Sequence, residues 1–378
     1  MLFIIANPVR EEYPMKIVSI ESFTTRHLCI VRVKGDDGSE GYGQTAPFHA
    51  NITALVLHQQ VAPAMIGAEI GEPGGIADFA ESHISRHYKF AWSYICRAVA
   101  GVETALWDLS GKRSGKSVCE LLGGAPRPLP VYGSSMKRDI SPEDEAARLV
   151  SLQNHKGIDA FKIRIGSGLG DNADVFPGRT ERVVEVVRKA LGEGTSLYAD
   201  ANGAYKPEKA IEVGRMLLDR GVCHYEEPCP FPELEWTRQV TEALSIPVTG
   251  GEQDNDMAQW RRMIAMRAVN VVQPDIGYVG GFSRALEVAR LARSAGILCM
   301  PHAANKSLLT VFTAHLLASI PNGGERMEFS IENETITKGL FNEPLDVQEG
   351  HYVMPEGPGW GISVNPDWLR EAEYAVTR

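Results

Sequence analysis

From about Leu129 onward, short apolar runs alternate with longer amphipathic segments. Eight of the runs have the length and composition of buried strands, and they are 129–135, 159–166, 196–202, 223–228, 247–252, 269–277, 297–303 and 326–332. The segments between them, such as 143–157 and 207–221, repeat apolar residues at intervals typical of helices, and several are bounded by Ser, Pro or Gly. Regular alternation of strand and helix predicts a parallel sheet, and eight such strands predict a closed β/α barrel.

The chain before the barrel has a different pattern. Residues 15–44 alternate apolar and polar positions, and the sequence GDDGSEG inside this stretch is typical of a hairpin turn. Residues 50–125 instead have helical spacing. Strands followed by helices predict a separate α+β domain over residues 15–128, placed ahead of a barrel domain over residues 129–345. We expect the Gly- and Pro-rich tail, residues 346–378, to return to the first domain.

Bulk composition excludes some classes of protein. The 378 residues are 44% hydrophobic and 23% charged, a balance typical of soluble globular proteins. A net charge of −10 argues against a nucleic-acid partner, and no apolar run is long enough to span a membrane. The apolar stretch in residues 1–14 is too short for the core of a secretion signal and follows no basic segment, so we expect these residues to be an upstream extension or a misplaced start. The six cysteines lack C-x-x-C spacing, so we expect a cytoplasmic protein with reduced thiols.

Six ionisable residues recur at nearly one interval at or near the ends of predicted strands. They are Asp200, Glu226, Glu252, Asp275, His302 and Glu328, separated by 26, 26, 23, 27 and 26 residues. One strand plus one helix occupies this interval, so a barrel brings all six side chains to its C-terminal rim, where such barrels build active sites. A carboxylate that caps the next helix could explain one or two of these positions, but not the series.

Three of the six residues predict a metal site. Asp200, Glu226 and Glu252 come from consecutive strands, which lie about 5 Å apart, and three carboxylates that close repel one another without a cation. Oxygen ligands alone favour Mg²⁺ over Zn²⁺. Asn202 points the same way as Asp200 and can add an oxygen or an amide donor. We interpret Glu227, which points into the opposite layer, as half of a structural ion pair.

The remaining polar residues predict proton transfer. Asp275 ends the strand beside His302 and would fix the tautomer of the imidazole and raise its basicity, as a general base requires. Lys162 and Arg164 are two apart on one strand and share a face. Lys162 can neutralise a substrate carboxylate or the enolate that develops from it, whereas Arg164 stays protonated and suits carboxylate or hydroxyl binding. Glu328 can serve as a neutral acid that donates to a carboxylate oxygen.

These residues lie in motifs that together resemble the enolase superfamily, and within it the mandelate racemase subgroup. The motifs are K-I-R at 162–164, then ADAN, YEEP, GGEQ, PDIGYVGG and PHAAN, with GYGQTAP and VETALWDLSGK before them and PEGPGWGISVNPD after them. The resemblance covers nearly the whole chain. It implies a (β/α)7β modified TIM barrel with an N-terminal α+β capping domain completed by the C-terminal tail, and a homo-oligomer.

The same resemblance implies the chemistry. Mg²⁺ would bind Asp200, Glu226 and Glu252, and the His302–Asp275 pair would remove the proton α to a carboxylate to give an enediolate intermediate. The Glu328 position matches the family's acid, which hydrogen-bonds that carboxylate.

One departure from the family pattern separates the possible reactions. The subgroup usually has Lys-x-Lys on this strand, and its second Lys is a base on the face opposite the His; here that position is Arg164. With a single clear proton carrier, we expect His302 to take the α-proton and return it to a leaving β-hydroxyl, which is dehydration of an acid sugar. A cycloisomerase acting on a lactone or anhydro sugar acid, and an epimerase that uses Arg164, remain alternatives. So does a non-catalytic barrel that only binds metal or a sugar acid.

Two loops of the first domain are candidates for substrate selection. In the family such loops cover the barrel mouth, and here they are TRHL at 25–28 and APFHAN at 46–51. His27 and His49 could contact sugar hydroxyls, although an ordinary exposed loop explains them equally well. Ser135, at the end of the first barrel strand, could bind the substrate carboxylate.

Overall fold

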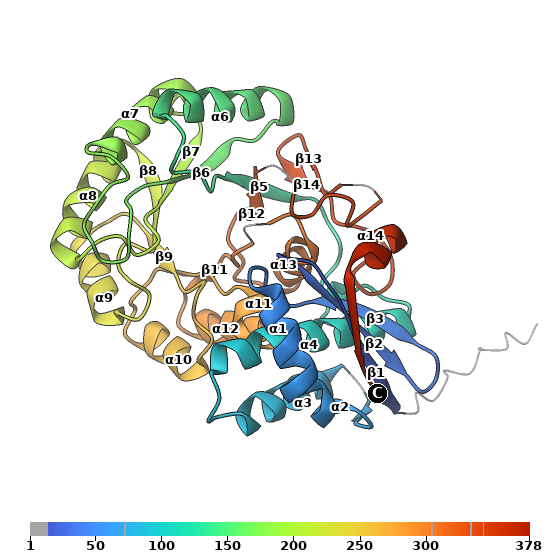
Figure 1. Cartoon of the computed structure of the whole chain (residues 1–378). Helices are drawn as coiled ribbons and strands as arrows, with labels where there is room; N and C mark the ends of the chain where they lie inside the picture. The colour runs from blue at the N-terminus through green and yellow to red at the C-terminus, as the bar shows by residue number, and fades with distance from the viewer. Residues whose placement is uncertain (1–13, 72, 304, 333–334, 343) are drawn as a thin grey trace, which may run out of the picture.

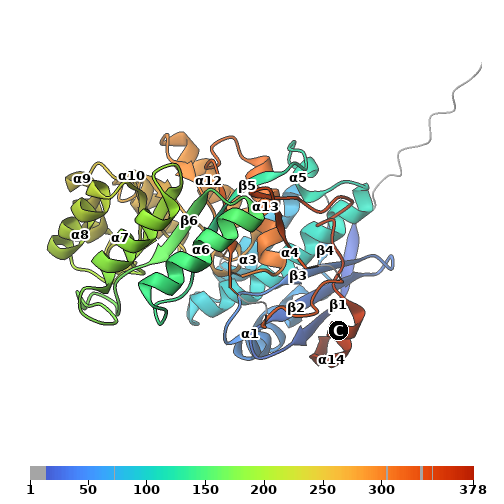
Figure 2. The ribbon, with the colours of Figure 1, turned by 90° about the horizontal axis from the view of Figure 1, so that it is seen from above.

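Two regions of the chain lie side by side in the computed structural model, a ring of strands surrounded by helices and a smaller sheet with helices of its own (Figures 1 and 2). The structure describes residues 14–378, except residues 72, 304, 333–334 and 343. Residues 1–13 therefore lie outside the described residues, and β1 begins at Met15.

The larger region is built on eight strands that pair in sequence order. They are β5 (Leu129–Ser134), β6 (Ala160–Arg164), β7 (Ser196–Asp200), β8 (Val222–Glu226), β9 (Val248–Gly250), β10 (Val271–Val272), β11 (Leu298–Cys299) and β12 (Met327–Ser330). Neighbours from β5 to β11 pair in parallel, and β12 pairs back with β5. A bridge from Cys299 to Gly323 links β11 to the segment before β12. The ring is therefore closed.

Helices connect the strands along the outside of the ring (Figure 1). They are α6 (Pro142–Lys156), α7 (Arg179–Leu191), α8 (Pro207–Asp219), α9 (Leu234–Ala243), α10 (Met257–Ala265), α11 (Ile276–Val279) followed by α12 (Phe282–Ser294), and α13 (Leu308–Ser319). The sequence sets their ends: the Ser141 side chain caps α6, and Gly157 ends it in a left-handed conformation. Seven connections carry helices and β12 is the last strand, so the predicted (β/α)7β barrel is confirmed.

The smaller region is the predicted N-terminal α+β domain. An antiparallel sheet of β1 (Met15–Thr24), β2 (Cys29–Gly35) and β3 (Glu40–Gln44) precedes the helical part. The helical part contains α1 (Ala50–Val56), the π-helix η1 (Leu57–Val61), α2 (Ala62–Met65), the short strand β4 (Glu69–Ile70), α3 (Gly74–Arg86), α4 (Trp92–Ser114) and α5 (Val118–Leu121). Burial alternates at the start of β1 and along the second half of β2, which is the pattern by which the sequence identified these strands.

The C-terminal tail joins both regions. Strands β13 (Val347–Gln348) and β14 (His351–Tyr352) form a hairpin, and β14 pairs with β5 of the barrel. After α14 (Pro366–Glu371), β15 (Glu373–Thr377) pairs antiparallel with β1 as the outer strand of the N-terminal sheet. Figure 1 shows the C-terminus beside β1. The tail thus completes the capping domain, as the sequence predicted.

A buried glutamate holds the capping domain against the barrel. Glu103 of α4 accepts hydrogen bonds from the backbone N–H groups of Phe282 (2.7 Å) and Ser283 (2.8 Å) and from the indole of Trp107 (2.9 Å). The carboxylate therefore caps the free N–H groups at the start of α12 from another domain. This contact fixes α4 next to α11 and α12, which lie beside the end of strand β10.

No helix among residues 14–378, with the gaps given above, is long and apolar enough to cross a membrane.

One histidine lies where barrel, capping domain and tail meet. The backbone N–H of Cys119 donates to His315 Nδ1 (3.2 Å), and His315 Nε2–H donates to the carbonyl of Trp360 (3.3 Å). Burial lowers the pKa of His315 to about 4, against smaller raising effects of the Trp360 carbonyl and of Glu120. His315 is therefore neutral in the folded protein at neutral pH.

This depressed pKa predicts acid sensitivity. Above pH 6.5, the ordinary histidine pKa, His315 is neutral in both the folded and the unfolded state, so its protonation does not reduce the free energy of unfolding. As pH falls toward about 4, only the unfolded state takes up the proton, which should cost the fold up to about 3 kcal/mol. Urea unfolding at several pH values should show a smaller loss in His315→Gln than in wild type. Equal pH slopes for the two proteins would contradict the assignment.

Candidate active site

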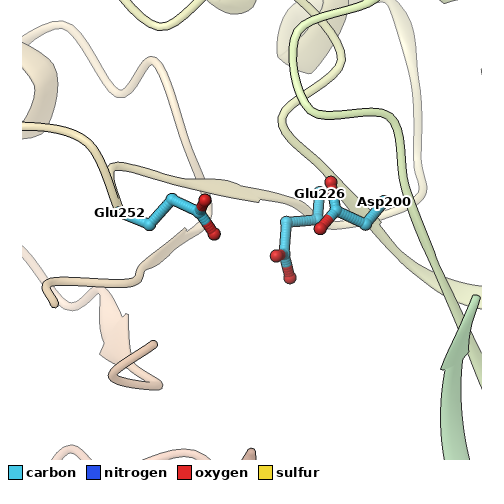
Figure 3. A group of neighbouring side chains, drawn as sticks. All are labelled: Asp200, Glu226 and Glu252. Carbon is cyan, nitrogen blue, oxygen red and sulfur yellow. The ribbon is translucent and has the colours of Figure 1, made fainter. Parts of the chain in front are cut away.

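The three carboxylates predicted to bind metal meet at one end of the barrel. Asp200 and Glu226 are the last residues of β7 and β8 and are paired in register, and Glu252 lies two residues beyond β9. All three are buried, and one oxygen from each lies within 4.8 Å of the others. Figure 3 shows the three side chains arising from neighbouring strands around a common space. The equal spacing in the sequence therefore corresponds to spatial convergence.

The chemistry of these donors fits Mg²⁺. The group consists of three carboxylates and contains no thiolate or imidazole. Carboxylate oxygens are the hard ligands that Mg²⁺ prefers. Glu252 Oε2 is buried and accepts no hydrogen bond from the described residues, and its one ionic neighbour among them is His302 Nε2, 3.3 Å away. Buried carboxylates at this separation also repel one another, and a divalent cation would relieve that repulsion.

Two cations of strand β6 already contact the triad. Lys162 and Arg164 share one face of the strand, as predicted. The Lys162 ammonium forms an ion pair with Glu226 and lies 2.8 Å from Glu328 Oε1. The Arg164 guanidinium forms an ion pair with Asp200 through Nη1. Burial acts to lower the pKa of Lys162, but the Glu226 and Glu328 carboxylates outweigh it and raise the pKa. Both side chains therefore face the carboxylates as charged groups.

The Arg164 guanidinium is fixed on several sides. Its Nε donates to the Ser135 carbonyl (2.9 Å), its Nη1 to Asn202 Oδ1 (2.8 Å) as well as to Asp200, and its Nη2 lies 2.7 Å from Met136 Sδ. The side chain is buried. These contacts make Arg164 a neighbour of a candidate metal ligand, and its predicted role in substrate binding is not tested by them.

His302 and Asp275 form the predicted pair. His302 Nδ1 lies 2.7 Å from Asp275 Oδ2, and the opposite nitrogen, Nε2, lies 3.3 Å from Glu252 Oε2. With Asp275 accepting from Nδ1–H, the free lone pair of the neutral ring is on Nε2 and faces the triad. Burial acts to lower the pKa of His302, but Glu252, Glu328 and Asp275 raise it to about 10. In the absence of a cation, His302 is thus the protonated partner of the carboxylates.

Glu328 lies close to both Lys162 and the residue that follows His302. Its Oε2 accepts from the backbone N–H of Ala303 (2.8 Å), and its Oε1 faces Lys162. Burial acts to raise the pKa of Glu328, whereas Lys162 and His302 lower it further than burial raises it. Without a cation or a substrate at the site, Lys162 therefore favours the ionised form of Glu328, and the role of Glu328 as a neutral acid stays a prediction.

Two further side chains around the triad were missed or misread from the sequence. Gln273 Nε2 donates to Glu226 Oε2 (2.7 Å), and the signal for it was its place two residues before Asp275, on the same face of the strand. Glu227 has no ion-pair partner among the described residues and instead lies 3.3 Å from Asn202 Nδ2. The structural ion pair expected for Glu227 is therefore wrong.

The predicted substrate contacts lie apart from one another. The Ser135 hydroxyl accepts from Arg148 Nη2 of α6 (2.6 Å), so it is engaged with a helix outside the ring. His27 and His49 lie together around a cavity of about 460 Å³ in the capping domain, which Glu373 of β15 also lines. Their roles toward a substrate stay predictions.

The loop that carries His49 begins at the barrel. Gln44, at the end of β3, donates to Ser307 Oγ (2.9 Å) and accepts from the Leu308 N–H (3.1 Å) in the segment that leads into α13. The capping loop therefore starts beside the loop that follows His302.

Comparison with known proteins agrees with this geometry. Residues 144–368 match the family described as enolase C-terminal domain-like, and residues 1–123 match the N-terminal domain of the mandelate racemase/muconate lactonizing enzyme family. These matches cover most of the chain. The protein therefore belongs to the mandelate racemase/muconate lactonizing enzyme family of the enolase superfamily.

Relatives of known activity are distant but nearly full length. An arabinonate dehydratase from Saccharolobus solfataricus is 27% identical over 95% of this chain and 91% of its own. A D-galactarolactone cycloisomerase from Agrobacterium fabrum is 28% identical over 96% of this chain and 95% of its own. The family relationship therefore includes both elimination and ring-opening or ring-closing reactions.

Solved structures show the same fold. A Roseobacter denitrificans protein, provisionally described as a racemase, is 49% identical and superimposes with a TM-score of 0.93 over 96% of this chain and all of its own. A Paracoccus denitrificans mandelate racemase/muconate lactonizing protein complexed with magnesium is 27% identical, with a TM-score of 0.87 over 96% of this chain and 98% of its own.

The triad predicts a measurable Mg²⁺ affinity that depends on each carboxylate. By titration calorimetry we expect one Mg²⁺ per chain, and Glu252→Gln should weaken binding by more than about 100-fold, because a direct ligand matters more than an outer-shell partner. Glu212→Gln, on the exposed face of α8, is the matched control and should bind like wild type. Undiminished affinity in Glu252→Gln would place the cation elsewhere.

Proposed function

We propose that this protein is a Mg²⁺-dependent acid-sugar dehydratase that removes the proton α to the substrate carboxylate. The observation that carries the proposal is one His302–Asp275 pair facing the Asp200, Glu226 and Glu252 carboxylates, with Arg164 bound to Asp200 on the other side. A protein that bound a sugar acid without turning it over would need neither a tautomer-fixed histidine nor its proximity to the triad.

The residues support a one-sided reaction. His302 Nε2 accepts the α-proton, the C–H electron pair enters an enediolate and then forms the Cα–Cβ double bond, and the β C–O bond breaks. The departing oxygen takes the proton back from His302 and leaves as water. The resulting enol becomes a 2-keto-3-deoxy acid when it loses the hydroxyl proton and gains one at Cβ.

Other side chains hold charge during this sequence. Lys162, between Glu226 and Glu328, is positioned to neutralise negative charge that develops on the substrate carboxylate. Bound by Asp200, Glu226 and Glu252, Mg²⁺ would supply the electrostatic stabilisation of that same charge. Glu328 keeps Lys162 oriented toward the site.

Arg164 is the reason for favouring dehydration over racemisation. Racemisation needs a proton carrier on each face of the substrate, and arginine stays protonated near neutral pH. The S. solfataricus dehydratase supports elimination. The A. fabrum cycloisomerase and the R. denitrificans structure support the alternative, an isomerase of the same superfamily.

Three further expectations form part of this proposal. The substrate is a small carboxylate with a β-hydroxyl, and Asn202, His27, His49 and Ser135 are the candidates for contacting it. The chain works as a homo-oligomer. It works in the cytoplasm, for which six unpaired cysteines are the supporting observation.

Removal of the base is the direct test of the mechanism. A screen of acid sugars with Mg²⁺ should identify one that yields a 2-keto-3-deoxy acid, and His302→Asn should slow turnover by about 10²- to 10⁴-fold or more. The variant should also lose exchange of the substrate α-proton with D₂O, and Asp275→Asn should retain the fold with a smaller loss of rate. Exchange at the wild-type rate in His302→Asn would make another residue the base, with Lys162 tested next.

The face of proton exchange separates the dehydratase from a racemase. We expect wild-type enzyme in D₂O to exchange the α-proton of only one enantiomer of a 2-hydroxy acid that lacks a β-leaving group, and not to invert it. Arg164→Lys should add slow exchange of the other enantiomer, because a lysine among cations can lose its proton more readily. NMR of both enantiomers measures this. Similar exchange of both by wild type would favour an epimerase or racemase.

A further inference from the structure

An arginine of the capping domain lies one aromatic ring away from the base and has no anionic partner among the described residues. The Arg97 guanidinium of α4 stacks 4.2 Å from the ring centroid of Tyr278, and the Tyr278 ring stacks at 6.5 Å on the ring of His302. Arg97 is half-buried, and among the described residues the Tyr278 ring is the one group that its guanidinium contacts. The three side chains thus form a column from the capping domain to the proton carrier.

Packing of α4 against α11 holds Arg97 and Tyr278 near the end of strand β10. Tyr278 lies on α11, which begins at Asp275 and packs against α4. The residue before Arg97, Cys96, lies 3.9 Å from the carbonyl of Asn255 in the loop that follows Glu252. Burial and then the Asp275 carboxylate raise the pKa of Tyr278, Arg97 opposes them, and Glu252 adds to the rise. The Tyr278 hydroxyl is therefore within electrostatic reach of both the base and the metal site.

Arg97 and Arg138, two arginines near the site, have no carboxylate within ion-pair distance among the described residues, and Arg138 is already engaged with the Ile165 and Gly166 carbonyls and with Asn202. Lys162 and Arg164 are paired with Glu226, Glu328 and Asp200, and His302 with Asp275. Arg97 has no carboxylate of this chain within ion-pair distance among the described residues. A guanidinium flat on an aromatic ring keeps its N–H groups pointing outward at the ring edge, where they suit a carboxylate.

We propose that Arg97, positioned by Tyr278, binds a second carboxylate at the far end of the substrate, so that the enzyme acts on dicarboxylic acid sugars in preference to monocarboxylic ones. This rests on the proposed function, which places the first carboxylate at the metal site. A six-carbon diacid separates its carboxyl carbons by roughly 6 Å, from C–C bonds of about 1.5 Å. This length, together with the roughly 3 Å of a carboxylate–guanidinium hydrogen bond, is comparable with the 6.5 Å from His302 to Tyr278 and the further 4.2 Å to Arg97.

Matched substrates test the preference. Galactarate against galactonate, and glucarate against gluconate, differ only in a distal carboxylate or hydroxymethyl group. In whichever pair is turned over, wild type should have a kcat/KM about 10- to 100-fold higher for the diacid than for the monoacid. This ratio corresponds to the free energy of one hydrogen bond to a charged group. Arg97→Met keeps an apolar contact with the Tyr278 ring and should lose this preference, mainly through KM, with little change toward the monoacid.

Two control variants make the test specific. Arg113→Met removes an arginine from the other end of α4, roughly 24 Å away along the helix, and should keep the preference. Tyr278→Phe retains the ring under Arg97 and should keep it too. A wild-type preference for the monoacids, or an equal loss toward both acids in Arg97→Met, would overturn the proposal and leave Arg97 as a solvated or structural group.

A binding measurement separates this proposal from the proposed function. Calorimetry of each matched pair with the His302→Asn protein in Mg²⁺ requires no turnover. The His302→Asn protein should bind the diacid more tightly than the monoacid, and adding Arg97→Met should remove this difference. Such a result supports the Arg97 site even if no acid sugar is dehydrated. Dehydration of acid sugars with no such difference in binding would support the reaction and reject the Arg97 site.

Discussion

The repulsion among three buried carboxylates is the constraint around which this protein is organised. Asp200, Glu226 and Glu252 each stand at or just beyond a strand end, and burial makes their mutual repulsion stronger than it would be in water. Lys162 and Arg164 offset part of it from the neighbouring strand. A site that is this costly without a cation is well suited to take up Mg²⁺, and the barrel supplies the rigidity that keeps the charges together.

The same electrostatic arrangement limits the chemistry. Arg164, where the family usually has a lysine, is bound to Asp200, to Asn202 and to a backbone carbonyl, and because an arginine stays protonated it cannot act as a proton acceptor. Within the described part of the chain, His302 is the one histidine that combines an orienting carboxylate with a nitrogen directed at the triad. A single proton carrier is sufficient for eliminating water, because the proton that it takes can leave with the β-hydroxyl.

The capping domain does more than cover the barrel, because it is attached to the barrel at several points. Glu103 caps a barrel helix from α4, and β15 of the tail completes the N-terminal sheet, so the two regions are fixed to each other at several points. Because α4 is held there, Arg97 reaches the mouth and stacks on Tyr278. Packing between the domains thereby connects the capping domain, which would select the substrate, to the barrel, which would react with it.

The sequence by itself determined the periodic features of this protein. Strand and helix intervals predicted the eight-stranded barrel, and the near-constant spacing of ionisable residues predicted that Asp200, Glu226, Glu252 and His302 would converge, because each parallel strand ends at the same rim. Only the tertiary structure decided how the remaining charges are distributed. Glu328 meets Lys162 two strands away in the closed sheet, Glu227 meets Asn202 instead of a cation, and the Arg97–Tyr278 contact depends on the docking of two domains. Such pairings join residues far apart in the chain, and no local period encodes them.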